Sequence, residues 1–197
     1  SVLGLAAYGL HALWMTWHAR RGRETVTPPV LPPEDWPRVV VQLPIFNEQH
    51  VVARLLQSCV RLDYPADRLQ IHILDDSDDA TETIVQHLSK YWREEGHDIV
   101  VIHRQNRRGF KAGALARGLE TARGDLIAIF DADFVPKPDF LKEMVPYLVA
   151  DSDLGFVQAR WGYLNADYSV LTRAQTLALD GHFVVEHLGR NRSGLLM

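Results

Sequence analysis

The sequence predicts an α/β fold built on a mostly parallel sheet with helices on both faces. Short apolar runs alternate along the chain with longer segments whose apolar residues recur every three or four positions. Strands that alternate with helices form parallel sheets, because each helix carries the chain back to the start of the next strand. The length of 197 residues suits one domain with a core of its own.

The composition narrows the class of protein further. Apolar residues make up 47% of the chain and charged residues 23%, which is the usage of a globular protein. The formal net charge of -4 gives no sign of the basic surface that nucleic acid requires, so we expect no nucleic-acid partner. The single cysteine, Cys59, excludes an internal disulfide and is expected to lie in the core.

The first residues differ from the rest of the chain. Residues 1–17 carry no charged Asp, Glu, Lys or Arg, and Arg20, Arg21 and Arg23 follow them. We predict a transmembrane helix at 1–19 that lacks its first turn, with the arginines on the cytoplasmic side. An ordinary buried helix is the alternative, because the run is short. The proline-rich segment 20–37 is then a linker, and 38–197 is the α/β domain.

The first predicted elements follow the linker. The run "VVVQL" is β-branched and predicts a strand. Asn47 is expected to cap a helix whose apolar stripe includes Leu55 and Leu56. After the next apolar run, Asp79 and Glu82 have the spacing of a capping box and predict the start of another helix.

The remaining elements continue the alternation. The helix beginning at 110 lies between Gly109 and Gly124, and "LIAIF" and "LGFVQA" are further apolar runs. The strands predicted in this way are 39–43, 69–74, 99–103, 126–130 and 154–159. The predicted helices are 48–61, 79–95, 110–122, 138–149 and 168–189.

Acidic pairs follow two of the predicted strands, Asp75 with Asp76 and Asp131 with Asp133. Ligands of open α/β sheets bind beyond the carboxyl ends of the strands, so all four carboxylates are expected at one edge. They would repel one another unless a cation intervenes, and carboxylate oxygens suit Mg²⁺ or Mn²⁺. Asp131 and Asp133 are the better metal pair, since alternate strand residues share a face.

Aspartates at strand ends can also have a purely structural role. The aspartate side chain often caps the turn that follows a strand, and this role suits Asp75 or Asp76, taken alone, about as well as ligand binding does. Asp78 and Asp79 are expected to be helix caps rather than ligands.

A basic stretch, "RQNRRGFKAGALARG", leads into the helix predicted at 110. A helix N-terminus binds anions through free backbone amides, and Lys111 is placed to reach a phosphate there. Arg107 and Arg108, taken singly, are better interpreted as residues of a solvated turn. Carboxylates for a metal, a lysine and a helix terminus together predict a diphosphate site.

The blocks "VQLPIFNE", "ILDDSDDAT", "NRRGFKAGALARG", "AIFDADFVPKPDF", "GFVQARW" and "LDGHFVVE" occur in an order that closely resembles the inverting GT-A glycosyltransferases of family 2. The resemblance covers residues 38–188 and is greatest to the cellulose-synthase-like group, with its mannan and glucan synthases. It implies a GT-A fold with a Rossmann-like sheet, which would follow the transmembrane helix predicted at 1–19.

The resemblance also implies roles for individual residues. Phe46 would face the nucleobase, and Asp131 and Asp133 would bind Mg²⁺ or Mn²⁺ on the sugar diphosphate. The residues implied to bind the nucleotide sugar are Pro44, Phe46, Asn47, Glu48, Asp75, Asp76, Lys111 and Asp131. Those implied on the acceptor side are Gln158, Arg160 and Trp161. Trp161 serves equally well as a core residue.

The implied activity is metal-dependent, inverting transfer of a hexose from UDP-glucose or GDP-mannose to a growing β-linked polysaccharide. The expected location is the cell membrane, with the catalytic domain facing the cytoplasm. The family's general base is expected beyond Met197, so we expect donor and metal binding here without completed transfer. Three alternatives stay open: transfer of a single sugar to a lipid acceptor, a haloacid-dehalogenase-like phosphohydrolase, and a non-catalytic nucleotide-sugar-binding fragment.

A histidine and a glutamate near the end of the chain have the spacing of neighbours on a helix. His182 and Glu186 are expected to share one helix face, which we interpret as a polar face rather than a metal site.

Overall fold

The computed structural model describes residues 2–20, 27 and 30–192. Its contacts divide the chain into two units, Pro28–Gly155 on the one hand and Ser1–Thr27 with Phe156–Met197 on the other. Much of the predicted linker, at 21–26 and 28–29, lies outside the described residues. In the described part of that linker, Pro33–Asp35 form one short 3₁₀ turn, η1.

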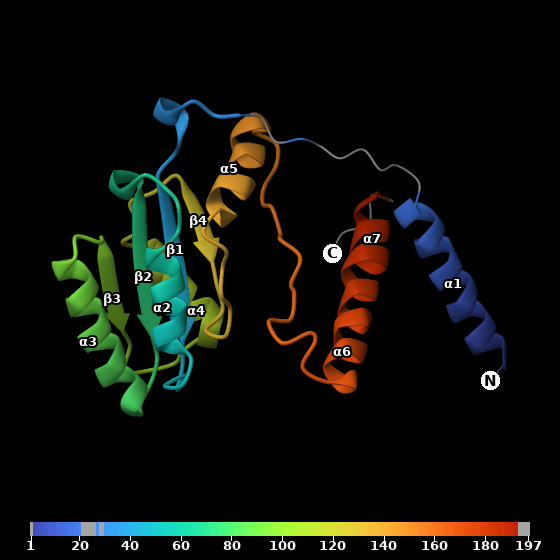
Figure 1. Cartoon of the computed structure of the whole chain (residues 1–197), viewed down its shortest axis with the longest axis horizontal. Coiled ribbons are helices and arrows are strands. Elements are labelled where there is room, and N and C mark those ends of the chain that lie inside the picture. Colours follow the sequence, from blue (N-terminus) through green and yellow to red (C-terminus); the bar gives the residue numbers. More distant parts are fainter. Residues whose placement is uncertain (1, 21–26, 28–29, 193–197) are drawn as a thin grey trace. The chain divides into compact units, whose positions relative to one another are not determined.

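The larger unit is built on a parallel sheet, as predicted. Its strands are β1 Val39–Ile45, β2 Leu69–Asp75, β3 Ile99–His103 and β4 Leu126–Ile129. They stand in the order β3-β2-β1-β4 (Figure 1). β1 pairs with both β2 and β4, so it is a central strand, and all the pairings are parallel. The strand predicted at 154–159 is wrong, because the structure has no regular element there.

Helices cover both faces of this sheet. They are α2 Val52–Val60, α3 Ala80–Glu94, α4 Phe110–Leu119 and α5 Phe140–Ala150. Alternate β1 residues such as Val41 and Leu43 pack with the buried side of α2 in one apolar core. α2 and α3 lie in front of the sheet in Figure 1.

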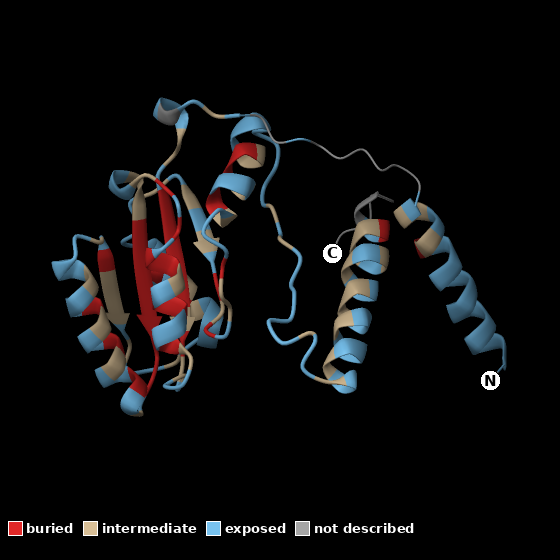
Figure 2. Cartoon of the chain, viewed as in Figure 1, coloured by how far each residue is buried: buried red, intermediate tan, exposed pale blue. Residues whose placement is uncertain are grey.

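The opposite face of the sheet carries α4, which approaches it at Gly118. A Cβ on Gly118 would lie only 2.7 Å from Nε2 of Gln42 and 2.9 Å from Cδ2 of Leu74. Glycine is therefore required for this helix to lie so close to the strands. The central strands are the most buried part of the unit (Figure 2).

The second unit is helical. It contains α1 Val2–Arg20, α6 Val170–Asp180, a π-helical segment η3 Gly181–His187 and α7 Leu188–Arg192. α1 packs on α7, where a Cβ on Gly189 would lie 2.9 Å from the Met15 carbonyl oxygen. The helix predicted at 168–189 is present, with the π segment as an interruption that periodicity does not reveal.

The transmembrane helix predicted at 1–19 is not supported. A helix forms at Val2–Arg20, but no helix in the described ranges combines the length and the apolarity needed to cross a bilayer. His11, Thr16 and His18 lower the hydropathy of α1 below that level.

Candidate functional site

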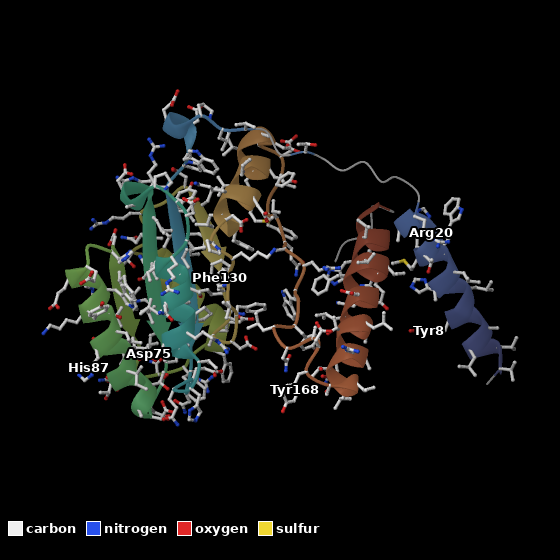
Figure 3. The ribbon with its side chains drawn as sticks, in the orientation of Figure 1. Tyr8, Arg20, Asp75, His87, Phe130 and Tyr168 are labelled. Atoms are coloured by element: carbon white, nitrogen blue, oxygen red, sulfur yellow. The ribbon has the colours of Figure 1, made fainter. Side chains whose placement is uncertain are left out.

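The carboxyl ends of the strands bring the predicted site residues of the larger unit to one edge. Ile45 at the end of β1 pairs with Asp75 at the end of β2, and Asp75 pairs with His103 at the end of β3. Figure 3 marks Asp75 and Phe130, which come from β2 and from the residue directly after β4. Segments that are distant in sequence therefore meet at this edge, as predicted for a parallel sheet.

Asp75 is fully buried, with 0% of its surface exposed. Its Oδ1 accepts a hydrogen bond from the backbone amide of Ser77 at 3.0 Å, and its Oδ2 lies 3.1 Å from Nδ1 of His103. A buried carboxylate needs such partners, because desolvation of an unpaired charge is costly. Both oxygens of Asp75 are thus used within the chain, and the residue fastens β2 to β3.

Asp76 forms a two-pronged ion pair with Arg104. Nε of Arg104 donates to Oδ1 of Asp76 at 2.6 Å, and Nη2 donates to Oδ2 at 2.5 Å. Hydrogen bonding to Asp76 raises the pKa of the Arg104 guanidinium above its ordinary value. Arg104 also donates to the carbonyl oxygens of Arg108 and Phe110, at 3.2 and 3.1 Å. It thereby ties β2 to the loop before α4, a function that the basic composition of this stretch does not reveal.

Asn47 does not cap a helix, so that prediction is wrong. α2 begins at Val52 with Val51 as its N-cap, and Asn47 adopts a left-handed conformation with φ 56°. Its side chain exchanges hydrogen bonds with Asp78, donating from Nδ2 at 2.8 Å and accepting from the Asp78 amide at 3.1 Å. Asp78 is consequently not a helix cap either. Asp79 is the N-cap of α3, as predicted, and accepts from the Thr81 amide.

Phe46 carries the guanidinium of Arg107 over its ring. The Arg107 Cζ atom lies 3.2 Å from the ring centroid of Phe46 and 5.4 Å from that of Phe110. Arg107 is therefore not the solvated turn residue expected from the sequence, because its guanidinium contacts the rings of Phe46 and Phe110. Its partner Phe46 lies far away in the sequence, so local sequence patterns give no sign of the contact.

Lys111 and Asp131 form an ion pair. Lys111 is the second residue of α4, and its side chain remains 52% exposed while that of Asp131 is 39% exposed. Asp133 lies two residues further on and is exposed. β4 ends at Ile129, and the Phe134 amide closes a turn onto the Asp131 carbonyl at 3.1 Å. The two aspartates therefore lie in a turn rather than on one face of a strand.

The donor set fits a divalent ion that binds together with a phosphate. The described residues contain no group of three or more His, Cys, Asp or Glu side chains that could hold a metal ion. Mg²⁺ at nucleotide sites is held by one or two carboxylates, while water and phosphate oxygens complete its coordination. Asp131 and Asp133 offer hard oxygen ligands of this kind, next to the ammonium group of Lys111.

The sequence matches the model of a known protein family. Residues 40–192 match the model of glycosyl transferase family 2. The chain belongs to glycosyl transferase family 2.

Similar proteins from plants include glucomannan 4-beta-mannosyltransferases. The chain is 42% identical over 162 residues to glucomannan 4-beta-mannosyltransferase 1 of Oryza sativa subsp. japonica, an alignment that covers 80% of this chain and 31% of that protein. It is 42% identical over 156 residues to glucomannan 4-beta-mannosyltransferase 2 of Arabidopsis thaliana, with coverages of 77% and 29%. The chain thus spans about three tenths of the length of these relatives.

A solved structure shares the fold. The mannosyltransferase PcManGT from Pyrobaculum calidifontis, in complex with GDP-Man and Mn²⁺, matches with a TM-score of 0.65 and 32% identity. The match covers 78% of this chain and 44% of that one. The predicted family and the GT-A-like parallel sheet are confirmed, and the family assignment disfavours the phosphohydrolase alternative.

Two further residues of the predicted family 2 donor site belong to β1 and the segment after it. Pro44 lies within β1, opposite Leu74 of β2. The Glu48 carbonyl oxygen accepts from the amides of Val51 and Val52 at 3.1 and 3.0 Å, at the start of α2. Glu48 is half-buried.

The residues assigned to the acceptor side belong to the helical unit, which is described separately from the sheet. Gln158 is exposed, and Arg160 forms an ion pair with Asp180 at 3.2 Å. Trp161 is 47% exposed and its ring centroid lies 5.8 Å from that of Phe183, so Trp161 is not a core residue.

His182 and Glu186 share a helix face, as predicted. Nδ1 of His182 lies 2.9 Å from Oε2 of Glu186. The two side chains pair with each other, which agrees with a polar helix face.

Proposed function

We propose that the larger unit is the donor-binding part of a metal-dependent, inverting mannosyltransferase that uses GDP-mannose and extends a β-linked polysaccharide. The main observation in support of this proposal is the ion pair between Lys111 and Asp131, close in sequence to the exposed Asp133, at the edge where the strands have their carboxyl ends. Two observations support mannose as the transferred sugar and guanine as the base of the donor. The chain is 32% identical to a mannosyltransferase whose structure was solved in complex with GDP-Man and Mn²⁺, and the plant relatives are named as mannosyltransferases.

Lys111 and the start of α4 would bind the diphosphate of the donor. The first amides of a helix have no partner within it and point toward an anion, and the helix dipole adds to the attraction. Lys111 stands one residue inside this terminus, and its side chain already contacts a carboxylate oxygen. A phosphate oxygen can replace that carboxylate oxygen as the partner of the ammonium group.

Asp131 and Asp133 would hold the divalent ion. When bound, the ion would neutralise negative charge as it develops on the leaving diphosphate. Asp131 would then exchange its contact with Lys111 for the ion, so that Lys111 and the ion together would offset the negative charge of the diphosphate. The exposure of Asp133 leaves its oxygens open to solvent and hence to an arriving ion.

Asp75 and Asp76 would support the part of the site that binds the nucleoside of the donor, and they would do so indirectly, through the residues that they bind. Each oxygen of Asp75 has a partner, Ser77 or His103, and both oxygens of Asp76 accept from Arg104. We therefore propose that this pair fixes the loop from Arg104 to Lys111, which presents the start of α4 to the diphosphate. Substitution of either aspartate would then loosen the donor site instead of removing one direct contact.

The acceptor and the cellular location also belong to this proposal. Gln158, Arg160 and Trp161 would meet the acceptor glycan, for which the exposed ring of Trp161 offers a stacking surface. Location at a cell membrane, with the catalytic domain facing the cytoplasm, stays a prediction from the sequence.

A calorimetric panel tests the proposed donor. The chain would be titrated with GDP-mannose, GDP, UDP-glucose and UDP, each with Mn²⁺, with Mg²⁺ and with a chelator. We expect metal-dependent binding that is tighter for the guanine than for the uracil compounds. Equal binding with chelator present would contradict the metal assignment, and tighter binding of UDP-glucose would contradict the choice of donor.

A further inference from the structure

Arg107 occupies the face of an aromatic ring beside the proposed diphosphate site. Its Cζ atom lies 3.2 Å from the centroid of the Phe46 ring, well within the range of a cation–π contact. Phe110, whose ring centroid lies 5.4 Å from the same atom, directly precedes Lys111. The contact between Arg107 and the two rings is therefore directly adjacent in sequence to Lys111, which forms an ion pair with Asp131.

The backbone of the loop is shaped to form this arrangement. Gly109 has φ 76°, and Phe110 has φ 49°, a conformation that a bulky residue rarely adopts. The Phe110 amide donates to the Arg107 carbonyl at 2.8 Å, and the Phe110 carbonyl accepts from Arg104. The loop is thus fixed on both sides of Phe110, although Phe110 remains 67% exposed.

The guanidinium is incompletely satisfied in this position. Nε of Arg107 is buried and has no hydrogen-bond partner among the described residues. A buried donor without an acceptor is costly, because it has lost water and gained nothing in return. The contact with the Phe46 ring therefore has to offset the cost of this unpaired donor. If the guanidinium left the ring, Nε could form a hydrogen bond with water.

We propose that Arg107 occupies the nucleobase position of the free chain and that the base of the donor displaces it from Phe46. This inference rests on the proposed function, since it takes the ligand to be a nucleotide. One face of a ring accepts one planar partner at van der Waals distance, so the base and the guanidinium compete for Phe46. The base then lies against Phe46, with Phe110 at its exposed side, and Arg107 sets the affinity through this competition.

A pair of matched variants tests the competition. Arg107→Ala and Arg108→Ala each remove one positive charge from the same loop, but only the first clears the ring, because Arg108 is exposed. With Mn²⁺ present, we expect GDP to bind Arg107→Ala about 2- to 30-fold more tightly than Arg108→Ala, the range equivalent to a cation–π contact. Circular dichroism of both variants confirms that they are folded.

A second measurement needs no substitution. Protons above an aromatic ring are shielded, so the Nε–H resonance of Arg107 in the full chain is expected well upfield of other arginines. Addition of GDP with Mg²⁺, which is diamagnetic, should move it to an ordinary position, while the Arg104 resonance stays in place through its Asp76 contact.

The outcomes separate this inference from the proposed function. GDP binding that is equal or weaker in Arg107→Ala than in Arg108→Ala, or an Arg107 resonance that keeps its shielding in the complex, overturns the competition and leaves the donor site standing. If GDP binds neither the wild-type chain nor any variant, the proposed function fails and this inference fails with it.

Discussion

Replacement of Arg104 by alanine tests how the edge of the sheet is held together. The substitution removes both hydrogen bonds to Asp76 and the two bonds to the carbonyl oxygens of Arg108 and Phe110. The Asp76 side chain is only 5% exposed and that of Arg104 only 14%, so the carboxylate is left desolvated without its counter-charge. Breaking a buried pair from one side costs about 3–5 kcal/mol, and we expect about 3 kcal/mol because this pair lies at the edge of the sheet.

The measurement is urea unfolding followed by circular dichroism. Arg117→Ala is the matched control, since it breaks the exposed pair between Arg117 and Glu120 at the end of α4. Exposed pairs contribute about 0–1 kcal/mol, so the control should lower the free energy of unfolding by less than about 1 kcal/mol. Arg104→Lys keeps the charge but loses the two-pronged geometry, and an intermediate loss is expected.

Similar losses of stability in Arg104→Ala and Arg117→Ala would refute this reasoning. Such a result would mean that water replaces Arg104 around Asp76, and that the loop before α4 has other anchors. A large loss of stability in Arg104→Ala with unchanged GDP affinity in the folded fraction would separate its structural role from the donor site.

Three further predictions concern stability and reactivity. A Cβ on Gly113 would lie 2.0 Å from the Arg108 carbonyl oxygen, so Gly113→Ala should cost about 2 kcal/mol in urea unfolding, whereas Gly155→Ala, with open space around it, should be neutral. Burial lowers the pKa of His72 below 6.5, so its contribution to the free energy of unfolding is constant above about pH 7 and falls as the pH drops through and below about 6.5. His72→Gln should remove this pH dependence of the free energy of unfolding. An unchanged pH dependence in the variant would contradict the role given to His72. Burial raises the pKa of Cys59 to about 12, so a thiol reagent at about pH 8 should react only after unfolding, and rapid reaction of the native chain would contradict this.

The sheet could be predicted because its signals are local. The run ending at Asp75 is rich in apolar residues, and β2 extends over Leu69–Asp75, one residue beyond the prediction. The strand predicted at 154–159 failed although its sequence is apolar as well, because a strand also needs a hydrogen-bonded neighbour. Composition predicts which segments can form strands, and pairing decides which of them do.

The site could be predicted by residue type but not by contact. Asp75, Asp76 and Lys111 lie at the edge where the pattern placed them, yet their partners come from other strands and loops. Asn47 has the chemistry of a helix cap and instead bonds Asp78, because its left-handed backbone turns it toward the turn after β2. Long-range pairing of this kind leaves no periodic trace in the sequence.

The central claim is that a divalent ion and the diphosphate of a nucleotide sugar bind together at Asp131, Asp133 and Lys111. Calorimetric titration of GDP-mannose into the wild-type chain and into Asp131→Asn, with Mn²⁺ and with chelator, tests it most directly. We predict Mn²⁺-dependent binding that Asp131→Asn abolishes. Wild-type affinity in Asp131→Asn, or affinity in the wild-type chain that is independent of Mn²⁺, would contradict it.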